Sequence, residues 1–424
     1  MTDLDLLDGE LYSPESPGYD LVRRPVDPRY GDVRPQYVVR CASVADVVRA
    51  ISSARSSNLR LVPRGGGHCF AGRSSTDGVV LDLSNLNGLS VDPDGIATIG
   101  AGARLAEVYS GLHSAGRALP AGCGATVGIT GLTLGGGIGL IGRKYGLTCD
   151  RLVRAQVVLA DGRIVECDED HEAELFWALR GAGGGQFGVV TSLRFATIAE
   201  PTACRIEAYP RDDVEQLVAA WQTWAPDAPD ELTVDLALIA EPGEPLRTRL
   251  FGASLLNETA TRALLRELVD QVDLVPAMPY HRLKSSFSDP PEERVMRSRS
   301  EFFSRPLSDA ASLLAEVGTP SKSRRELSFT AMGGAYNRVA EDATAFAHRN
   351  ERFLLDHVGS TDDPWIDASW AIAHRDGSGR VYPNFPDAAL DDGPTAYHAG
   401  NLARLRVVKR TYDPDRFFDF PQAI

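Results

Sequence analysis

The chain places a histidine directly after a run of glycines. The stretch LVPRGGGHCFAGRSS, residues 61–75, has three consecutive glycines before His68 and a fourth at Gly72. Glycine adopts positive φ and lets the backbone approach another molecule closely. Two interpretations stay open from these residues alone. Either the loop binds phosphate and the histidine has no chemical role, or the loop positions the histidine for a reaction.

A second glycine cluster, PAGCGATVGITGLTLGGGIGLIGRKYGLTCD, spans residues 120–150. It contains a Gly-x-Gly-x-x-Gly pattern at Gly137, Gly139 and Gly142. In a nicotinamide-binding unit this pattern follows a strand, opens a helix and has an acidic residue about 20 positions later. Gly146 interrupts the helix that such a unit requires. The context therefore disfavours a nicotinamide site.

Charge and cysteine usage restrict the classes of partner. The 424 residues include 58 acidic and 44 basic side chains, a net charge of −14. Nucleic acids and anionic membranes bind clustered Lys and Arg, so neither is an expected partner.

The six cysteines form no Cys-x-x-Cys pair, which argues against a disulfide framework or a metal site and favours a cytoplasmic location. We expect neither a signal peptide nor a membrane span.

The elements that position these loops are of two kinds. Residues 35–200 alternate short strands and helices, with Ser43 capping a helix at 44–56 and a further helix at 105–114. A hairpin at 154–168 turns at Asp161-Gly162. Longer β-rich runs follow residue 202, which predicts a second domain with a larger antiparallel sheet backed by helices. A basic helix near the C-terminus ends at an Asp-Pro pair.

The order of these segments carries a family resemblance. The Arg-Gly-Gly-Gly-His loop, the extended glycine-rich segment, the hairpin, LRGAGGGQFGVVTS and finally VYPNFPD (381–387) follow one another along the chain. This order resembles the FAD-linked oxidases of the vanillyl-alcohol-oxidase superfamily, most closely the bacterial berberine-bridge-enzyme-like branch. The resemblance implies an α+β, two-domain FAD-binding fold of the PCMH type. Its parts would be an FAD domain of two subdomains at 1–200, a substrate domain at 201–376 and a segment at 377–424 that returns to the FAD domain.

The resemblance also implies the FAD contacts. His68 matches the histidine that the family joins covalently to the flavin 8α-methyl group, and a neutral imidazole is a competent nucleophile. Backbone N–H groups of the surrounding loop would bind the diphosphate as an anion nest. The pyrophosphate loop would comprise Arg64, Gly65, Gly66, Gly67, His68, Gly72, Arg73 and Ser74. Further contacts would come from Thr126, Val127, Gly128, Gly131, Leu132 and Gly136, with Gly188 and Val190 at the adenine.

Cys123 raises the question of a second covalent bond. Many relatives link a cysteine to flavin carbon 6 within a pattern like Pro-Ala-Gly-x-Cys-Pro-Thr-Val-Gly. Counting back from Thr126 puts Gly124 at the linking position, one residue after Cys123. A one-residue offset in an extended segment turns a side chain to the other face, which favours a single bond through His68. A glycine kink at Gly124 leaves the second bond open.

The VYPNFPD stretch matches the family's Tyr-x-Asn-x-x-Asp motif. By this resemblance Tyr382 faces the substrate side of the flavin, and Asn384 hydrogen-bonds the ring or orders the site. A phenol with a pKa near 10 is a poor base at neutral pH unless a cation or the flavin environment lowers it. Tyr336, His348 and His374 are further candidates that could project toward the substrate, with core or surface roles as the alternative.

The resemblance implies an FAD-dependent oxidase. Hydride would pass from a C–H bond of a small molecule, expected to be a secondary metabolite, to flavin N5, and O2 would reoxidise the flavin. The alternatives are a dehydrogenase with another electron acceptor, a nicotinamide-dependent reductase of the related cell-wall type and a non-catalytic flavin-binding protein. The sequence does not predict the oligomeric state.

Overall fold

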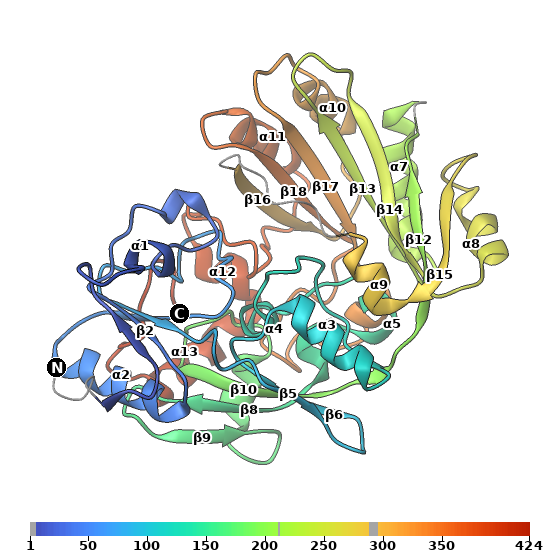
Figure 1. Cartoon of the computed structure of the whole chain (residues 1–424). Helices are drawn as coiled ribbons and strands as arrows, with labels where there is room; N and C mark the ends of the chain where they lie inside the picture. Colours follow the sequence, from blue (N-terminus) through green and yellow to red (C-terminus); the bar gives the residue numbers. More distant parts are fainter. Residues whose placement is uncertain (1–5, 211–212, 288–295) are drawn as a thin grey trace.

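The computed structural model describes residues 6–210, 213–287 and 296–424, which form two lobes (Figure 1). The first small sheet has the order β1-β2-β4-β3. Its β2, β4 and β3 are parallel, and β1 pairs antiparallel with β2. The bounds are β1 Glu10–Tyr12, β2 Tyr37–Arg40, β3 Leu61–Arg64 and β4 Val79–Asp82, with the crossover helix α2 at Val44–Ser56.

Helix α2 begins where the capping signal predicts. The Ser43 side chain accepts a hydrogen bond from the Asp46 backbone N–H, and the Asp46 carboxylate bonds the Ser43 backbone N–H in return. This reciprocal arrangement satisfies two backbone donors at the start of the helix. The N-terminal helix α1 covers Tyr19–Val22.

A second, antiparallel sheet has the order β5-β6-β10-β8-β9. The predicted hairpin is confirmed by the pairing of β8 with β9, and α3 covers Leu105–Ser114 as predicted. Leu112 of α3 and Phe195 of β10 belong to the largest core cluster. The bounds are β5 Leu89–Val91, β6 Ile96–Gly100, β8 Leu152–Val158, β9 Ile164–Cys167, β10 Val189–Ala196 and α6 Ala173–Leu179, with the short pair β7 Arg117–Ala118 and β11 Ile198–Ala199.

The Gly137–Gly142 stretch does not form a nicotinamide-binding unit. It follows the helix α4, Ile129–Leu134, rather than a strand. The helix that comes after it, α5, spans only Gly142–Tyr145 before Gly146 ends it with φ 88°. The structure thus agrees with the context argument against that interpretation.

The second lobe contains a seven-stranded antiparallel sheet of order β15-β12-β14-β13-β17-β18-β16. One face is covered by helices, with Trp221 of α7 and Trp365 of α11 packed against Phe329 and Phe353. This confirms the predicted sheet backed by helices. The strands are β12 Thr202–Ala208, β13 Leu232–Ala240, β14 Arg247–Ser254, β15 Asp273–Pro279, β16 Met296–Phe303, β17 Arg325–Ala331 and β18 Phe353–Ser360. The helices are α7 Val214–Trp224, α8 Glu258–Leu265, α9 Tyr280–Ser285, α10 Ala310–Val317 and α11 Trp365–Ala373.

The other face of this sheet is directed toward the first lobe. In β18, Phe353 and Leu355 pack with the helices, whereas Leu354 packs in a separate cluster with Tyr336 and Tyr382. Successive side chains of a strand alternate between the faces. Asp356 therefore lies on the same face as Leu354.

The C-terminal segment returns to the first lobe. In α13, Leu402–Tyr412, the Lys409 ammonium donates hydrogen bonds to the Gln186 and Phe418 carbonyls and contacts the Asp413 carboxylate. The preceding helix α12 covers Gly393–His398. From these contacts we propose divisions near residues 200 and 376. No helix of the described residues is long and apolar enough to cross a membrane.

Candidate functional site

A cavity lies in the first lobe, and residues of the C-terminal segment form part of its lining. It encloses about 1370 Å³ not occupied by protein atoms, part of it open to solvent. Its walls come from β3 and the loop after it, the segment around α4, the loop before β10 and the motif loop. The structure brings together in its lining most of the sequence-predicted residues: Gly65, Gly66, Gly67, His68, Arg73, Ser74, Val127, Gly128, Gly131, Leu132, Gly188, Val190 and Asn384.

Close backbone packing explains two of the glycines. A Cβ atom on Gly66 would lie 2.2 Å from the Gly128 backbone nitrogen, and one on Gly128 would lie 2.4 Å from the Gly66 nitrogen. Gly67 has φ 75°, a conformation that side chains disfavour. The two glycine clusters of the sequence thus meet backbone to backbone at the cavity wall.

Two buried polar atoms in the lining have no partner. Among the described residues, Ser74 Oγ and Arg73 Nε are buried without a hydrogen bond. The Arg73 guanidinium also donates to Gln422 Oε1 at 3.3 Å and lies 4.9 Å from the Phe420 ring centroid. Buried polar atoms without partners are rare in folded proteins. A hydroxyl and a guanidinium N–H suit phosphate oxygens, so these residues fit the diphosphate of FAD.

His68 lies at the edge of the same lining. Its Nε2 is 2.9 Å from the Thr126 hydroxyl oxygen. Burial lowers the pKa of the imidazole below its usual 6.5, and the nearby Arg104 charge lowers it further. The ring is therefore neutral at neutral pH and keeps the lone pair that a nucleophile needs.

Tyr382 is buried next to the cavity wall. Its phenolic oxygen accepts hydrogen bonds from the backbone N–H groups of Gly137 and Ile138, at 3.1 and 3.0 Å, and from Asn384 Nδ2 at 3.0 Å. Burial raises the pKa of Tyr382, and these hydrogen bonds oppose the rise. The phenol is therefore protonated at neutral pH. Asn384 also donates to the Leu132 carbonyl, which ties the motif to the α4 segment.

Several predicted residues do not line the cavity. Arg64 requires a correction, because its guanidinium turns away and donates to the Ser74, Val22 and Arg23 carbonyls. It shapes the loop rather than facing a phosphate. A Cβ on Gly72 would meet the Tyr30 ring and one on Gly136 the Phe346 ring, so these glycines permit packing. The other predicted residues outside the lining are Cys123, Thr126 and Tyr382.

Cys123 has a contact of its own. Its Sγ accepts a hydrogen bond from Lys284 Nζ at 3.1 Å, and the same ammonium donates to the Ala121 carbonyl at 2.9 Å. Lys284 comes from α9 of the second lobe and is almost fully buried. The thiol is thus engaged with the lobe junction.

The three further candidates occupy different places. Tyr336 is buried, and its hydroxyl donates to the Gly139 carbonyl. His348 is fully buried with a pKa lowered by burial to about 3, and its Nε2 is 3.0 Å from the Tyr397 carbonyl oxygen. His374 pairs with Glu301 at 2.8 Å on the helix-covered side of the large sheet. His374 therefore does not face the first lobe.

Sequence reasoning missed several functional candidates. Asp356 is buried, its carboxylate accepts from the Ser298 hydroxyl, and burial raises its pKa to about 7. No local pattern in FLLDHVGS distinguishes it from a surface aspartate. Lining residues that were also missed are Phe70, Thr130, Gly184, Gly185, Phe385 and Phe420. The run of glycines in RGAGGGQFG was the available signal for Gly184 and Gly185.

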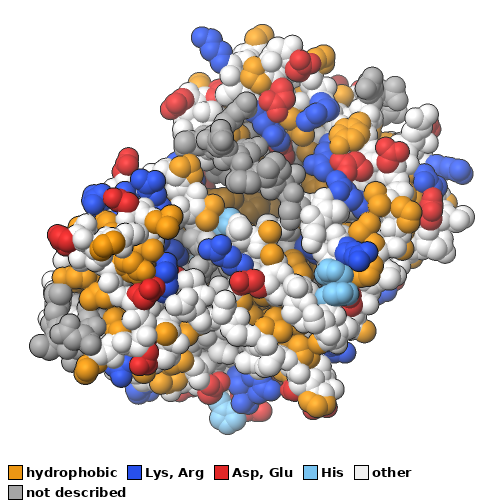
Figure 2. Space-filling view, in the orientation of Figure 1, with side chains coloured by type: hydrophobic (Ala, Val, Ile, Leu, Met, Phe, Trp, Pro, Cys, Tyr) orange, Lys and Arg blue, Asp and Glu red, His pale blue; other side chains and the backbone are white. Residues whose placement is uncertain are grey.

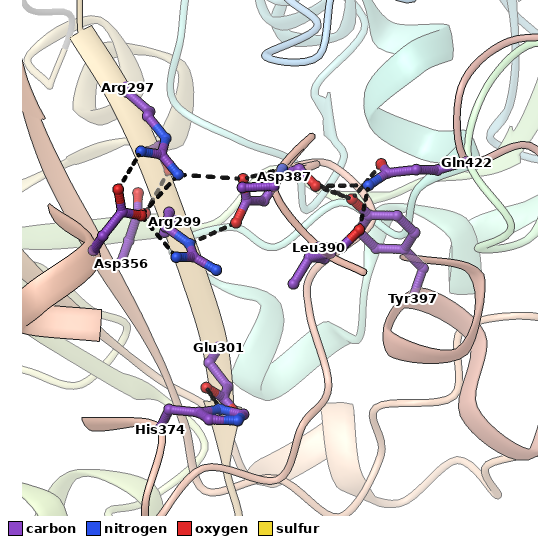
Figure 3. A network of polar contacts seen from close by, with 12 residues as sticks. Arg297, Arg299, Glu301, Asp356, His374, Asp387, Leu390, Tyr397 and Gln422 are labelled. Carbon is purple, nitrogen blue, oxygen red and sulfur yellow. Dashed lines mark hydrogen bonds and ion pairs between the residues drawn. The ribbon is translucent and has the colours of Figure 1, made fainter. Parts of the chain in front are cut away.

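A polar network anchors the motif loop at its last residue (Figure 3). The Asp387 carboxylate is 2.6 Å from Arg299 Nε of β16, and both side chains are almost fully buried. The Asp387 backbone N–H donates to the Tyr397 hydroxyl, and Gln422 Nε2 donates to the Asp387 carbonyl. Since Gln422 also contacts Arg73, the network connects the large sheet with the cavity lining.

Comparisons with known proteins indicate the family. Residues 35–168 match the FAD binding domain family, and residues 381–424 match the berberine and berberine like family. The FAD-linked oxidoreductase YgaK of Bacillus subtilis is 33% identical, over 99% of this chain and 97% of the relative. The xylooligosaccharide oxidase of Thermothelomyces thermophilus is 30% identical, over 92% of this chain and 87% of the relative.

A solved structure is similar over the whole chain. The glucooligosaccharide oxidase of Acremonium strictum, described with a 6-S-cysteinyl, 8α-N1-histidyl FAD, superposes with a TM-score of 0.89. It is 25% identical, and the match covers 100% of this chain and 98% of that one. The lobes, the cavity and both family matches lead to one conclusion: this chain belongs to the berberine-bridge-enzyme-like FAD-linked oxidoreductases.

Proposed function

We propose that this chain is an oxidase that holds its FAD through one covalent bond, from His68 to the flavin 8α carbon. The observation that carries the proposal is a neutral imidazole on a glycine loop, in the same cavity lining as buried Arg73 and Ser74 atoms that lack partners. The Thr126 hydroxyl occupies Nε2, so the bond uses Nδ1. FAD, when bound, accepts a hydride from a substrate C–H bond at N5, and O2 is the proposed final electron acceptor.

The proposed substrate is a small molecule with an alcohol group. Serine, threonine and carboxylate side chains stand on the sheet face that is directed toward the first lobe, among them Ser298 and Asp356. Hydroxyl and carboxylate groups hydrogen-bond alcohols. Two of the similar proteins are named as oligosaccharide oxidases, which supports a saccharide. A secondary metabolite with an accessible alcohol stays the alternative.

Tyr382 and Asp356 are the proposed acid–base pair. Tyr382 receives three N–H donors at its oxygen, an arrangement that stabilises a phenolate once its proton leaves. Asp356 lies on the sheet face whose Leu354 packs in one cluster with Tyr382. With a pKa of about 7, its carboxyl group is suited to exchanging that proton near neutral pH.

Acid precipitation tests the covalent bond. We expect the yellow colour to stay in the acid pellet of the wild-type protein and of Cys123→Ala, and to be lost from the pellet of His68→Ala. Colour kept by His68→Ala and lost by Cys123→Ala would overturn the assignment. Retention of FAD by native His68→Ala, measured before precipitation, separates loss of the bond from loss of binding.

A substrate screen tests the reaction. Oligosaccharides with a free reducing end should reduce the flavin anaerobically, and each turnover in air should release one H2O2. Flavin reduction without H2O2 release would identify a dehydrogenase instead. Reduction by NADPH alone would identify a reductase, and no reduction by any alcohol would favour a binding protein.

A further inference from the structure

Three side chains with metal-binding chemistry meet at the junction of the two lobes. His113 lies in the last turn of α3, Glu200 directly follows β11, and His281 lies in the first turn of α9. His113 Nδ1 is 2.6 Å from one Glu200 carboxylate oxygen, and His281 Nδ1 is 3.1 Å from the other. One ligand atom from each residue lies within 4.8 Å of the other two.

We propose that His113, Glu200 and His281 form a binding site for a divalent transition-metal ion, with Zn²⁺ the best match. Two imidazole nitrogens and one carboxylate oxygen are a donor set that binds zinc in proteins, and imidazole favours transition metals over Mg²⁺ or Ca²⁺. The imidazole rings stack with their centroids 3.4 Å apart, and both Nδ1 atoms point to the same carboxylate.

The proton balance of this site is simple. In the metal-free protein each Nδ1 contacts a carboxylate oxygen, so a hydrogen on Nδ1 bridges them. On metal binding that hydrogen leaves Nδ1, the ring keeps a single hydrogen on Nε2, and the Nδ1 lone pair bonds the ion. The His113 side chain is 41% exposed, so water reaches the ion and completes its coordination.

The charge at the junction favours a cation. The Glu200 side chain is only 10% exposed, and among the described residues its ion-pair partners are the two histidines. A largely buried carboxylate is stabilised by a cation that reaches its oxygens. A dication at the three ligand atoms would supply such a cation.

The proposed oxidation does not use these residues. None of them lines the cavity, and they belong instead to the contact between α3 and α9. At that contact Tyr109 and Tyr280 meet edge to face, with 5.9 Å between ring centroids, and Lys284 of α9 reaches the Ala121 carbonyl. A bound ion would therefore join the two lobes and stabilise their junction.

Metal binding tests the proposal on the full chain with its flavin. After dialysis against EDTA, we expect Zn²⁺ to bind with a stoichiometry of one by calorimetry and to raise the melting temperature, whereas Mg²⁺ at the same concentration does neither. Co²⁺ in place of Zn²⁺ should give visible absorption typical of a nitrogen–oxygen site. His113→Ala, Glu200→Gln and His281→Ala should each weaken Zn²⁺ binding at least tenfold.

His171→Ala provides the matched control. His171 also contacts a carboxylate through Nδ1, that of Asp168 at 2.9 Å, but it belongs to no three-residue group among the described residues. This variant should bind Zn²⁺ like the wild type. Absence of tight Zn²⁺ binding by the wild-type protein would overturn the proposal, whether or not the variants fold. Binding that survives His281→Ala and Glu200→Gln would overturn it as well.

Discussion

At the scale of single residues, the protonation state of His68 should control formation of the proposed covalent bond. Burial and Arg104 lower its pKa, so the imidazole stays neutral and nucleophilic to more acidic pH than a free histidine. We expect FAD added to flavin-free protein to become acid-stable at a rate that is constant above pH 6.5 and falls only below it. Time courses of acid-precipitable flavin absorbance across pH measure this. A rate that already falls well above pH 6.5 would contradict it.

Tyr382 and Asp356 carry the second prediction at this scale. Tyr382→Phe and Asp356→Asn should each lower kcat by about 10²- to 10⁴-fold, the usual contribution of a general acid or base. Tyr412→Phe is the control, because that hydroxyl bonds Glu172 on the surface. Covalent flavin content should be unchanged in all three variants. A kcat within a few-fold of wild type for Tyr382→Phe would remove Tyr382 from the mechanism.

The pH profile follows from the raised pKa of Asp356. A carboxyl group with a pKa of about 7 is protonated below that pH and cannot accept a proton there. We expect kcat to rise with pH through about 7 and the rise to disappear in Asp356→Asn. Steady-state rates from pH 5 to 9 measure it. A flat wild-type profile would contradict the role of this residue.

At the scale of elements, the motif loop depends on its attachment to β16. Removing one partner of a buried ion pair leaves an uncompensated charge and costs about 3–5 kcal/mol. Asp387→Asn should lower the free energy of unfolding by less than this, about 1–3 kcal/mol, because Arg299 loses its hydrogen bond to a charged group but keeps its ion pair with Asp367 at 2.8 Å. Urea unfolding measures this change. Arg34→Met, whose pair with Asp20 is half exposed, should change it by less than about 1 kcal/mol.

Short sequence patterns predicted individual helices and hairpins well. They predicted poorly which residues from distant parts of the sequence come together. Ser43 and the Asp161-Gly162 turn mark their helix and hairpin because a cap or turn is determined by a few neighbouring residues. The glycine loop was recognisable because its sequence carries the family pattern. The direction of the Arg64 side chain was not predictable, because two of its partners, Val22 and Arg23, lie about 40 positions away. Asp356 was missed because the sequence alone does not show which face of the sheet a strand residue occupies. That depends on how the assembled sheet packs.

At the scale of the whole molecule, the net charge and the charges visible on one face bear on the class of partner. Acidic and basic side chains are interspersed over the face seen in Figure 2, with no continuous basic surface of the kind that nucleic acid needs. The net charge of −14 points the same way. The junction histidines show the limit of sequence reasoning at this scale. Glu200 lies 87 and 81 positions from its two partners. No spacing pattern of Cys or His in the sequence predicted that these three residues meet.

The contact between Arg73 and Gln422 joins positions 349 residues apart, and Phe420 closes the same wall. During synthesis His68 leaves the ribosome long before those residues exist. We therefore expect FAD to bind only once translation is nearly complete. A stalled nascent chain that ends at residue 200 should remain colourless in the presence of FAD, whereas the released full-length chain should turn yellow. Flavin attached to the stalled chain would show that the late residues are dispensable for loading.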